Sequence, residues 1–339
     1  MQHDDRTVSL DGLRGLAALM VVASHASGLG LNLIPGLALT GIGKYGVYLF
    51  FVLSAFLLTT QWLRAFEAER VDGHYLRRYL LRRVLRIYPL YALVLVIGLA
   101  LAPRGLGVPL DAAALWRHLR LQEGRGLYWS IPVEFLYYLC IPPLAWLLSR
   151  PWPYVVRLFA LVGLLATASL VYPAALTPAN SSALGYYLSV FISGSAAAWF
   201  ALDRENKPLH YWSVFDALAV LSILLSIPQV FQAAGWFADV DALHRLHLAW
   251  GLAWSAMLIG VLQGRMPLWR KLLATGFWRS CGHWCFGIYL LHMPALYAVR
   301  KLPMPGVFQA WLGLGLSLAL AGLAHKLIEA PAIRFGHRV

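Results

Sequence analysis

The sequence is poor in charged residues. Only 13% of its 339 residues are Asp, Glu, Lys or Arg, and 60% are hydrophobic, whereas soluble domains average about 25% charged and roughly 45–50% apolar residues. A soluble fold of this length has no interior large enough for so much apolar surface. The composition therefore argues against a soluble enzyme and indicates a membrane protein.

Acidic residues and cysteines are scarce as well. Fifteen acidic residues face 28 Lys and Arg, for a formal net charge of +13. The basic residues fall between apolar runs, where they orient the chain and meet anionic lipid head groups, so we expect membrane lipid and not nucleic acid as a partner. Cys140, Cys281 and Cys285 provide no disulfide framework. Cys281, His283 and Cys285 offer too few ligands for a metal site, so no bound metal is expected.

Long apolar runs dominate what is present. The acidic pair at the N-terminus is wrong for a signal peptide, so the first run is expected to stay in the protein as a helix. A span needs about 20 apolar residues. Ten windows qualify: 11–30, 45–63, 87–103, 129–148, 155–172, 184–202, 211–229, 243–263, 284–300 and 307–328. The predicted fold class is all-α and polytopic, with about ten transmembrane helices forming one bundle. Residues 1–339 are expected to form a single membrane domain without a separate soluble domain.

The distribution of Lys and Arg predicts that both termini are cytoplasmic. The segment 64–86 contains seven arginines, whereas 173–183 and 230–242 contain no Lys or Arg, and cytoplasmic loops are the ones enriched in these residues. The loop 104–128 is the exception, because it places four arginines on the outer side. We expect it to lie along the membrane interface as an amphipathic segment.

Two ionisable residues lie inside the first predicted span. Arg14 and His25 are eleven residues apart, which on an α-helix puts them on one face about 16 Å from each other. Histidine can accept a proton near neutral pH, and arginine binds anions or polarises carbonyls. Taken alone, the pair slightly favours a structural interpretation, with a snorkelling arginine and a packed interior histidine.

Six motifs, in order along the chain, favour a functional role for Arg14 and His25. They are Leu10-Asp11-Gly12-Leu13-Arg14-Gly15-Leu16-Ala17-Ala18 with His25; Gly43, Gly46-Val47 and Phe50-Phe51-Val52-Leu53-Ser54-Ala55-Phe56; Arg82-Arg83-Val84-Leu85-Arg86-Ile87-Tyr88-Pro89-Leu90-Tyr91; Trp129-Ser130-Ile131-Pro132-Val133-Glu134-Phe135; Ile288-Tyr289-Leu290-Leu291-His292; and Ile328-Glu329-Ala330-Pro331. Together they resemble the membrane acyltransferase-3 family, whose hallmark is Arg, ten residues, then His. The sequence departs from that family at Ala55, where Gly is usual, and at Cys285-Phe286-Gly287, where Ser-Tyr-Ser is common.

The resemblance implies a ten-span core and an acyl-CoA donor, commonly acetyl-CoA, taken from the cytoplasm as a substrate and not held as a bound cofactor. Arg82, Arg83 and Arg86 are helical neighbours and suit the phosphates of coenzyme A, because guanidinium groups bind phosphate oxygens in pairs. The alternative is that these arginines only anchor the helix at the cytoplasmic face.

The resemblance also implies roles for the candidate catalytic residues His25, Arg14 and Glu134. His25 would act as general base on the acceptor hydroxyl, with a covalent acyl-imidazole as the alternative. Arg14 would position the donor or polarise the thioester carbonyl. Glu134 would orient His25, hold the acceptor, or form a structural ion pair.

Four further residues are candidates for substrate binding. Tyr289 and His292 are neighbours on one helix and are expected to line the same cavity, with a core hydrogen bond as the alternative. Trp129 would stack on a sugar or on pantetheine, or else serve as an interface tryptophan. Ser130 belongs to the same motif as Trp129.

We therefore predict a bacterial inner-membrane O-acyltransferase that transfers an acyl group, most readily acetyl, to a hydroxyl of an envelope or exported polysaccharide. One alternative is the same chemistry on a small molecule. Another is a transporter or flippase of a lipid-linked saccharide, since ten spans with internal charges also suit a transporter.

Overall fold

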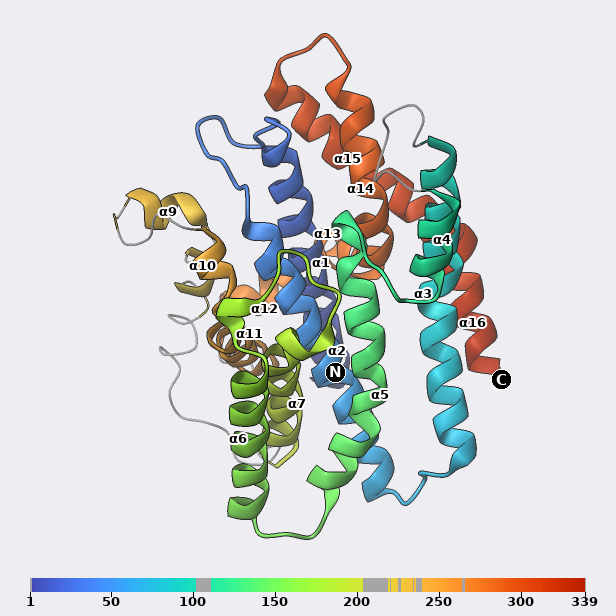
Figure 1. Ribbon diagram of the computed structural model, residues 1–339, viewed down its shortest axis with the longest axis vertical. Coiled ribbons are helices and arrows are strands. Elements are labelled where there is room, and N and C mark those ends of the chain that lie inside the picture. Colours follow the sequence, from blue (N-terminus) through green and yellow to red (C-terminus); the bar gives the residue numbers. More distant parts are fainter. Residues whose placement is uncertain are drawn as a thin grey trace.

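The protein is described by a computed structural model covering residues 2–101, 111–203, 219, 221–224, 227–233, 235, 240–263 and 266–338. Over these residues the chain is helical, without β-strands, and carries one isolated bridge between Ile34 and Leu37. The α-helices, drawn in Figure 1, are α1 (Gln2–Gly28), α2 (Ile42–Glu67), α3 (Gly73–Leu101), α4 (Ala112–Leu119), α5 (Ser130–Ser149), α6 (Tyr154–Val171), α7 (Leu188–Asp203), α9 (Pro228–Ala233), α10 (Val240–His244), α11 (His247–Leu262), α12 (Pro267–Leu273), α13 (Gly276–His283), α14 (Cys285–Arg300), α15 (Gly306–Ala324) and α16 (Ala330–Arg338). Short 3-10 helices cover Gly126–Trp129 (η2), Ala174–Leu176 (η3) and Leu184–Tyr187 (η4), and a π-helical turn (η5, His325–Glu329) joins α15 to α16.

Most of the windows predicted to span the membrane are helical. Nine of the ten predicted windows coincide with described helices, whereas the window 211–229 falls mostly outside the described residues. Within the described chain, six helical segments are long and apolar enough to cross a membrane, and α11 is a shorter apolar helix. These helices make the protein a multi-pass membrane chain. The third helix begins at Gly73, fourteen residues before the predicted window, so the arginines of α3 lie on the helix itself.

Helix α2 is the centre of the bundle. In its most apolar window 78% of the residues are buried, against 11% for the helix over Tyr154–Leu176. It packs against α1, α5, α7 and α11. An apolar helix that is buried all round lies inside a bundle, whereas one whose apolar side chains are exposed faces lipid. Helix α2 is therefore an inner helix, and α6 is an outer one.

Small residues let α1 approach its neighbours closely. A side chain at Gly12 would meet the backbone oxygen of Leu273 at 2.2 Å, and one at Gly282 would meet that of Asp11 at 1.9 Å. Such close backbone contact is typical of helix packing in membranes. The result is a rigid contact of α1 with α12 and α13 at the end of α1 that carries Arg14.

The departure from the family pattern at Ala55 is accommodated by the opposite helix. Ala55 is fully buried, and its methyl group lies where a side chain on Gly194 of α7 would approach to 2.9 Å. A methyl group on α2 thus faces a glycine on α7, so the two backbones still pack closely.

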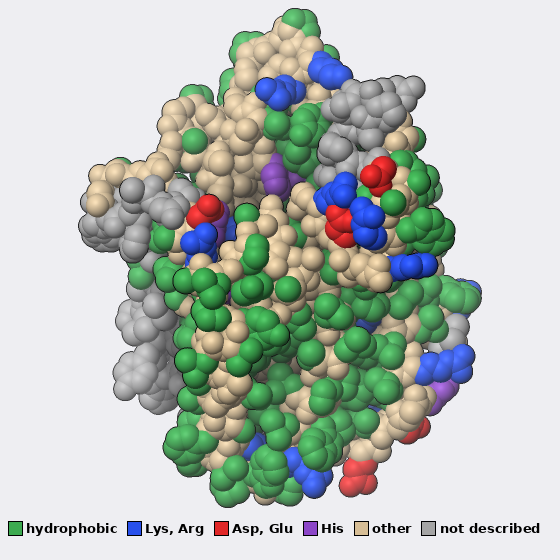
Figure 2. All heavy atoms as spheres, viewed as in Figure 1, with side chains coloured by type: hydrophobic (Ala, Val, Ile, Leu, Met, Phe, Trp, Pro, Cys, Tyr) green, Lys and Arg blue, Asp and Glu red, His purple; other side chains and the backbone are tan. Residues whose placement is uncertain are grey.

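One face of the molecule shows the band expected of a lipid-exposed surface. In Figure 2 hydrophobic side chains cover most of the lower part of this face, and charged groups gather along its upper border and at its lower edge. In Figure 1 the α5–α6 connection and the α2–α3 connection lie at the bottom, and the α14–α15 connection lies at the top. Apolar surface bounded by charge on both sides is what a bilayer and its two interfaces require.

Candidate active site

A pair of histidines joins α1 to α14. The Nε2 atom of His292 lies 3.0 Å from Nδ1 of His25, and the ring centroids are 4.9 Å apart. His292 is fully buried behind His25. The two residues are 267 positions apart in the sequence, so only the packing of α14 on α1 brings them together.

Hydrogen bonds to the backbone determine the protonation of both rings. His292 Nδ1 lies 3.1 Å from the carbonyl oxygen of Ile288, and His25 Nδ1 lies 3.0 Å from that of Val21. A carbonyl oxygen only accepts, so in the neutral rings Nδ1 carries the proton. The one hydrogen on His25 Nδ1 is then shared between the Val21 carbonyl oxygen and His292 Nε2, which both accept it, and the free lone pair of His25 is on Nε2.

His25 lines a large cavity, which we call the wide cavity. Its volume is about 720 Å³. Its walls come from the end of α1, the start of α2, η2, the segment 177–180, α10, the start of α11 and α14. The polar and charged residues that line it are Ser24, His25, Lys44, Tyr48, Arg125, Thr177, Asn180, Asp241, His244, Arg245, His247, Tyr289 and Tyr297.

Arg14 lines a second cavity, which we call the narrow cavity. Its volume is about 90 Å³, and it lies among α1, α2, α3, α5 and α14. Its polar and charged lining consists of Arg14, Ser54, Arg83, Arg86, Ser130, Glu134, Tyr138, Cys285 and Tyr289, and the remaining wall is aliphatic or phenylalanine. Arg14 and His25 therefore share one helix but face different cavities.

Tyr289 stands between the two cavities. Tyr289 and Val47 line both of them. The Tyr289 hydroxyl donates to the carbonyl oxygen of Leu127 and lies 2.8 Å from Ser130 Oγ, which must then donate to it. This tyrosine is held at two points and forms part of the wall that the two cavities share.

Glu134 is held by two hydroxyl groups. Ser54 Oγ and Tyr138 OH both donate to Glu134 Oε1, each at 2.6 Å. Glu134 faces the narrow cavity and not His25. Of the three roles considered from the sequence, orientation of His25 does not fit this geometry, because His292 holds that ring. The carboxylate instead places a negative charge among Arg14, Arg83 and Arg86.

The other predicted arginines separate into two groups. Arg14 Nη1 forms an ion pair with Asp11 Oδ1 at 3.1 Å, one turn earlier on α1. Arg83 and Arg86 line the narrow cavity. Arg82 does not, because its Nε donates to the carbonyl oxygen of Gly336 at 3.2 Å and so fastens α3 to α16.

Two of the residues predicted to bind substrate are placed differently from the expectation. Tyr289 lines the cavities but His292 lies behind His25, so the expectation that both line one cavity holds for Tyr289 alone. Trp129 lines the wide cavity yet is only 4% exposed, and the Lys44 ammonium lies 3.8 Å from its ring centroid.

Several residues that line the wide cavity lie outside the sequence motifs. Lys44, Asn180 and Asp241 belong to none of them. Lys44 could still have been noticed, because a charged residue beside a predicted span is energetically expensive and so indicates a functional site. His244, Arg245 and His247 interrupt the start of the predicted span 243–263 and line the wide cavity. Polar residues that interrupt the apolar sequence of a predicted span are thus a second indication of a functional site.

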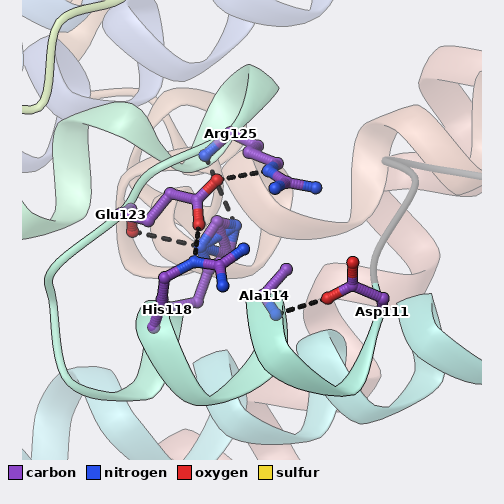
Figure 3. Close-up of polar contacts among 6 residues, drawn as sticks. Asp111, Ala114, His118, Glu123 and Arg125 are labelled. Atoms are coloured by element: carbon purple, nitrogen blue, oxygen red, sulfur yellow. Dashed lines mark hydrogen bonds and ion pairs between the residues drawn. The ribbon is translucent and has the colours of Figure 1, made fainter.

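The rim of the wide cavity is held by the loop after α4, shown in Figure 3. Glu123 forms ion pairs with Arg117 and Arg125, and His118 Nδ1 lies 3.1 Å from the Glu123 carbonyl oxygen. The backbone N–H of Arg125 donates to His118 Nε2 at 3.3 Å. The hydrogen bond from Arg117 lowers the pKa of Glu123, and burial lowers the pKa of His118. This cluster stabilises the segment that delivers Arg125 to the cavity.

Helix α4 itself is amphipathic, in line with the expectation for this loop. Its Asp111 side chain accepts from the backbone N–H of Ala114 and caps the helix. His118 is fully buried, whereas Trp116 is 63% exposed. The preceding part of the predicted interfacial segment, residues 102–110, lies outside the described residues.

Across the described chain, no three His, Cys, Asp or Glu side chains are grouped to hold a metal ion.

Three known proteins resemble this chain along nearly its whole length. Nodulation protein 10 of Rhizobium leguminosarum bv. viciae is 27% identical over 96% of this chain and 93% of its own. Peptidoglycan O-acetyltransferase OatA of Listeria monocytogenes is 24% identical over 97% of this chain and 56% of its own. The putative peptidoglycan O-acetyltransferase YrhL of Bacillus subtilis is 25% identical over 99% and 56%. The chain thus spans little more than half the length of the last two.

No solved structure gives a significant match. The family model described as an acyltransferase domain, however, matches residues 7–325. That range contains both histidines and all the lining residues of the two cavities. With nearly the whole chain matched, the protein belongs to this acyltransferase family.

Proposed function

We propose that this protein is an integral membrane O-acyltransferase that transfers an acyl group, most readily acetyl, from acyl-CoA to a hydroxyl of a cell-envelope or exported polysaccharide. The observation that carries the proposal is the meeting of two unlike cavities at Tyr289 beside the His25–His292 pair. Family membership supports acyl transfer, and two of the relatives are named for O-acetylation of peptidoglycan.

The proposed topology has ten spans, both termini in the cytoplasm, and the bacterial inner membrane as its location. The bacterial sources of the three relatives support this location. The arginine-rich connection 64–86 then faces the cytoplasm, together with the α5–α6 connection at the same end of the bundle. The wide cavity, lined by the end of α1 and the start of α2, lies toward the other end of the bundle.

The donor is assigned to the narrow cavity. It is lined by Arg14, Arg83 and Arg86, and guanidinium groups bind phosphate and polarised carbonyl oxygens. Its 90 Å³ admit the slender thioester end of acyl-CoA but not the nucleotide, which would remain outside this cavity. Glu134 keeps the arginine cluster partly neutralised.

The acceptor is assigned to the wide cavity, where His25 acts as base. As the acceptor oxygen attacks the thioester carbonyl carbon, His25 Nε2 takes the hydroxyl proton. The C–S bond then breaks, and the thiolate of coenzyme A leaves and takes up that proton. His292 accepts a hydrogen bond from His25 Nδ1 throughout, so it keeps Nε2 as the basic atom and stabilises the charged ring.

The test is radiolabelled acetyl-CoA added to membranes with and without the protein, followed by tracing of the label. We expect label in a saccharide fraction only when the protein is present. His25→Ala should lower transfer by about 10²–10⁴-fold, the usual contribution of a general base, while labelled acetyl-CoA still binds the purified variant.

His74→Ala is the matched control, because His74 is an exposed histidine at the start of α3 that lines neither cavity. It should leave transfer unchanged. Full activity in His25→Ala would contradict the mechanism. A purified protein that neither binds nor consumes acetyl-CoA would point to a transporter instead.

A further inference from the structure

A lysine is fixed in the wall of the wide cavity on the side formed by α2 and the segment 177–180. The Lys44 ammonium lies 3.8 Å from the ring centroid of Trp129, 3.3 Å from Asn180 Oδ1 and 3.5 Å from Tyr187 OH. The ion pairs of the described residues do not include Lys44. Its charge is therefore positioned by an aromatic face and an amide, and no carboxylate in the described part of the chain forms an ion pair with it.

Two buried polar atoms of the same cavity have no hydrogen-bond partner among the described residues. They are His247 Nδ1 and Thr177 Oγ1, and both residues line the wide cavity. His247 is 2% exposed and Thr177 is 8% exposed. Buried polar groups are nearly always paired, so these two atoms indicate a polar occupant of this part of the cavity.

The charged groups of the cavity carry an excess of positive charge. Lys44, Arg125 and Arg245 face one carboxylate, Asp241. Glu123, outside the cavity, is shared between Arg125 and Arg117, so it neutralises only one of those two arginines. A cavity lined by cations of this kind attracts anions and holds them by charge-assisted hydrogen bonds.

We propose that Lys44, Asn180, Thr177 and His247 form a subsite for an anionic oxygen group, a carboxylate or a phosphate, on the acceptor saccharide. The inference rests on the proposed function and deepens it, because it names the acceptor as an acidic saccharide. Trp129 then serves mainly to hold Lys44 by a cation–π contact, since the ammonium lies over its ring.

The subsite would also set which hydroxyl reacts. Lys44 and His25 line one cavity from different helices, α2 and α1. Anchoring the acid group at Lys44 leaves a hydroxyl elsewhere on the same saccharide to lie against His25. A neutral saccharide would lack this anchor and lose the buried charge-assisted contact.

Equilibrium binding of radiolabelled oligosaccharides to the purified full-length protein tests the proposal. The probes are oligogalacturonate for the carboxylate, a glycerol phosphate oligomer for the phosphate, and chitotetraose as the neutral reference. We expect at least one acidic probe to bind about tenfold or more tightly than chitotetraose, the size of one charge-assisted contact. The tighter of the two acidic probes identifies the anionic group.

Variants at Lys44 distinguish binding at the subsite from general electrostatic attraction of acidic saccharides to a basic protein. Lys44→Gln should abolish the acidic preference, and Lys44→Arg should keep most of it. Lys301→Gln is the matched control, an exposed lysine on the α14–α15 connection, and should change nothing. Binding of chitotetraose as tight as both acidic probes, failure of both acidic probes to bind, or an unchanged preference in Lys44→Gln would each overturn the subsite.

Binding of labelled acetyl-CoA to the same preparations distinguishes this failure from failure of the proposed function. If the acidic preference is absent while acetyl-CoA binds, the subsite is wrong and the acyltransferase assignment stands. If acetyl-CoA does not bind to wild type, the proposed function itself fails.

Discussion

The narrow and the wide cavity carry similar charge but are built from different parts of the chain. Three cations and one carboxylate line each of them. The narrow cavity lies among long helices, and hydroxyl, thiol, aliphatic and phenylalanine side chains form the rest of its wall. The wide cavity is formed by helix ends, short helices and connecting segments, and it adds three histidines, Asn180 and Thr177.

The difference suits the two tasks of the proposed reaction. A small space among packed helices limits the water around a thioester, and its arginines are worth more there than in water. The roomier space has the volume for a saccharide and is lined partly by connecting segments, which is where specificity commonly lies. Three experiments test whether the cavities are as distinct as this division requires.

The sharpest contrast within the arginine motif is between Arg86 and Arg82. Arg86 lines the narrow cavity, whereas Arg82 binds the Gly336 carbonyl oxygen. Arg86→Gln should raise the KM for acetyl-CoA by about 10- to 100-fold, the value of a charge-assisted hydrogen bond of roughly 1.5–3 kcal/mol. Arg82→Gln should leave this KM nearly unchanged. Equal effects of the two variants would mean that the arginines act as a general anchor.

Removal of the Tyr289 side chain, which lies between the cavities, should increase hydrolysis of acetyl-CoA. Tyr289→Ala opens the narrow cavity to the wide one, so water should reach the thioester and acceptor-independent hydrolysis of acetyl-CoA should rise severalfold. Tyr289→Phe keeps the ring and loses only the bonds to Leu127 and Ser130, so hydrolysis should stay close to the wild-type rate. Release of free acetate measures both. No rise in Tyr289→Ala would show that the two spaces are not joined there.

The smallest effect is expected at the rim of the wide cavity and depends on pH. Burial lowers the pKa of His118 from its ordinary value of 6.5, so the unfolded loop takes up a proton before the folded loop does. The stabilisation is complete above about pH 6.5 and declines as pH falls toward the lowered pKa, because protonation of Nε2 removes the bond from the Arg125 N–H. Glu123, whose pKa is lowered from 4.5, contributes to loss of stability only at more acidic pH.

Hydrogen exchange over residues 111–126, corrected for intrinsic rates, measures this opening. Protection should fall between pH 7 and pH 5.5 while the helices of the narrow cavity stay protected. His118→Gln should remove the pH dependence in this range. Unchanged protection of the wild-type loop over the same range would contradict the role of His118.

Prediction from the sequence worked best where a feature lies within one helix. The apolar windows located nine of the described helical segments, and their ends agree within a few residues except at the starts of α1 and α3, which begin nine and fourteen residues before their windows. The α3 window started late because hydropathy falls over the arginines, whereas a helix continues wherever its backbone bonds are satisfied and its charged side chains find a cavity or water. Arg14, Arg83, Arg86 and Glu134 were all recognised by motif, and all line the narrow cavity.

The wide cavity was recognised only in part. His25, Trp129 and Tyr289 belong to motifs, but Lys44, Asn180 and the histidines of the α10–α11 region do not. They come from helix ends and connections far apart in the chain, where neither period nor spacing is constrained. The partner of His25 was also not predictable, since His292 and Glu134 carry comparable signals in the sequence.

The sequence by itself determined that this is a multi-pass membrane acyltransferase and that Arg14 and His25 lie on one helix, because composition, apolar run length and helical spacing are local properties. The tertiary structure alone decided that Arg14 and His25 face two different cavities, that His292 holds His25, and that Lys44 meets Trp129. Those relations depend on which helices pack side by side, and that is set by close backbone contacts such as Gly12 against Leu273 and Gly282 against Asp11, which no local pattern encodes.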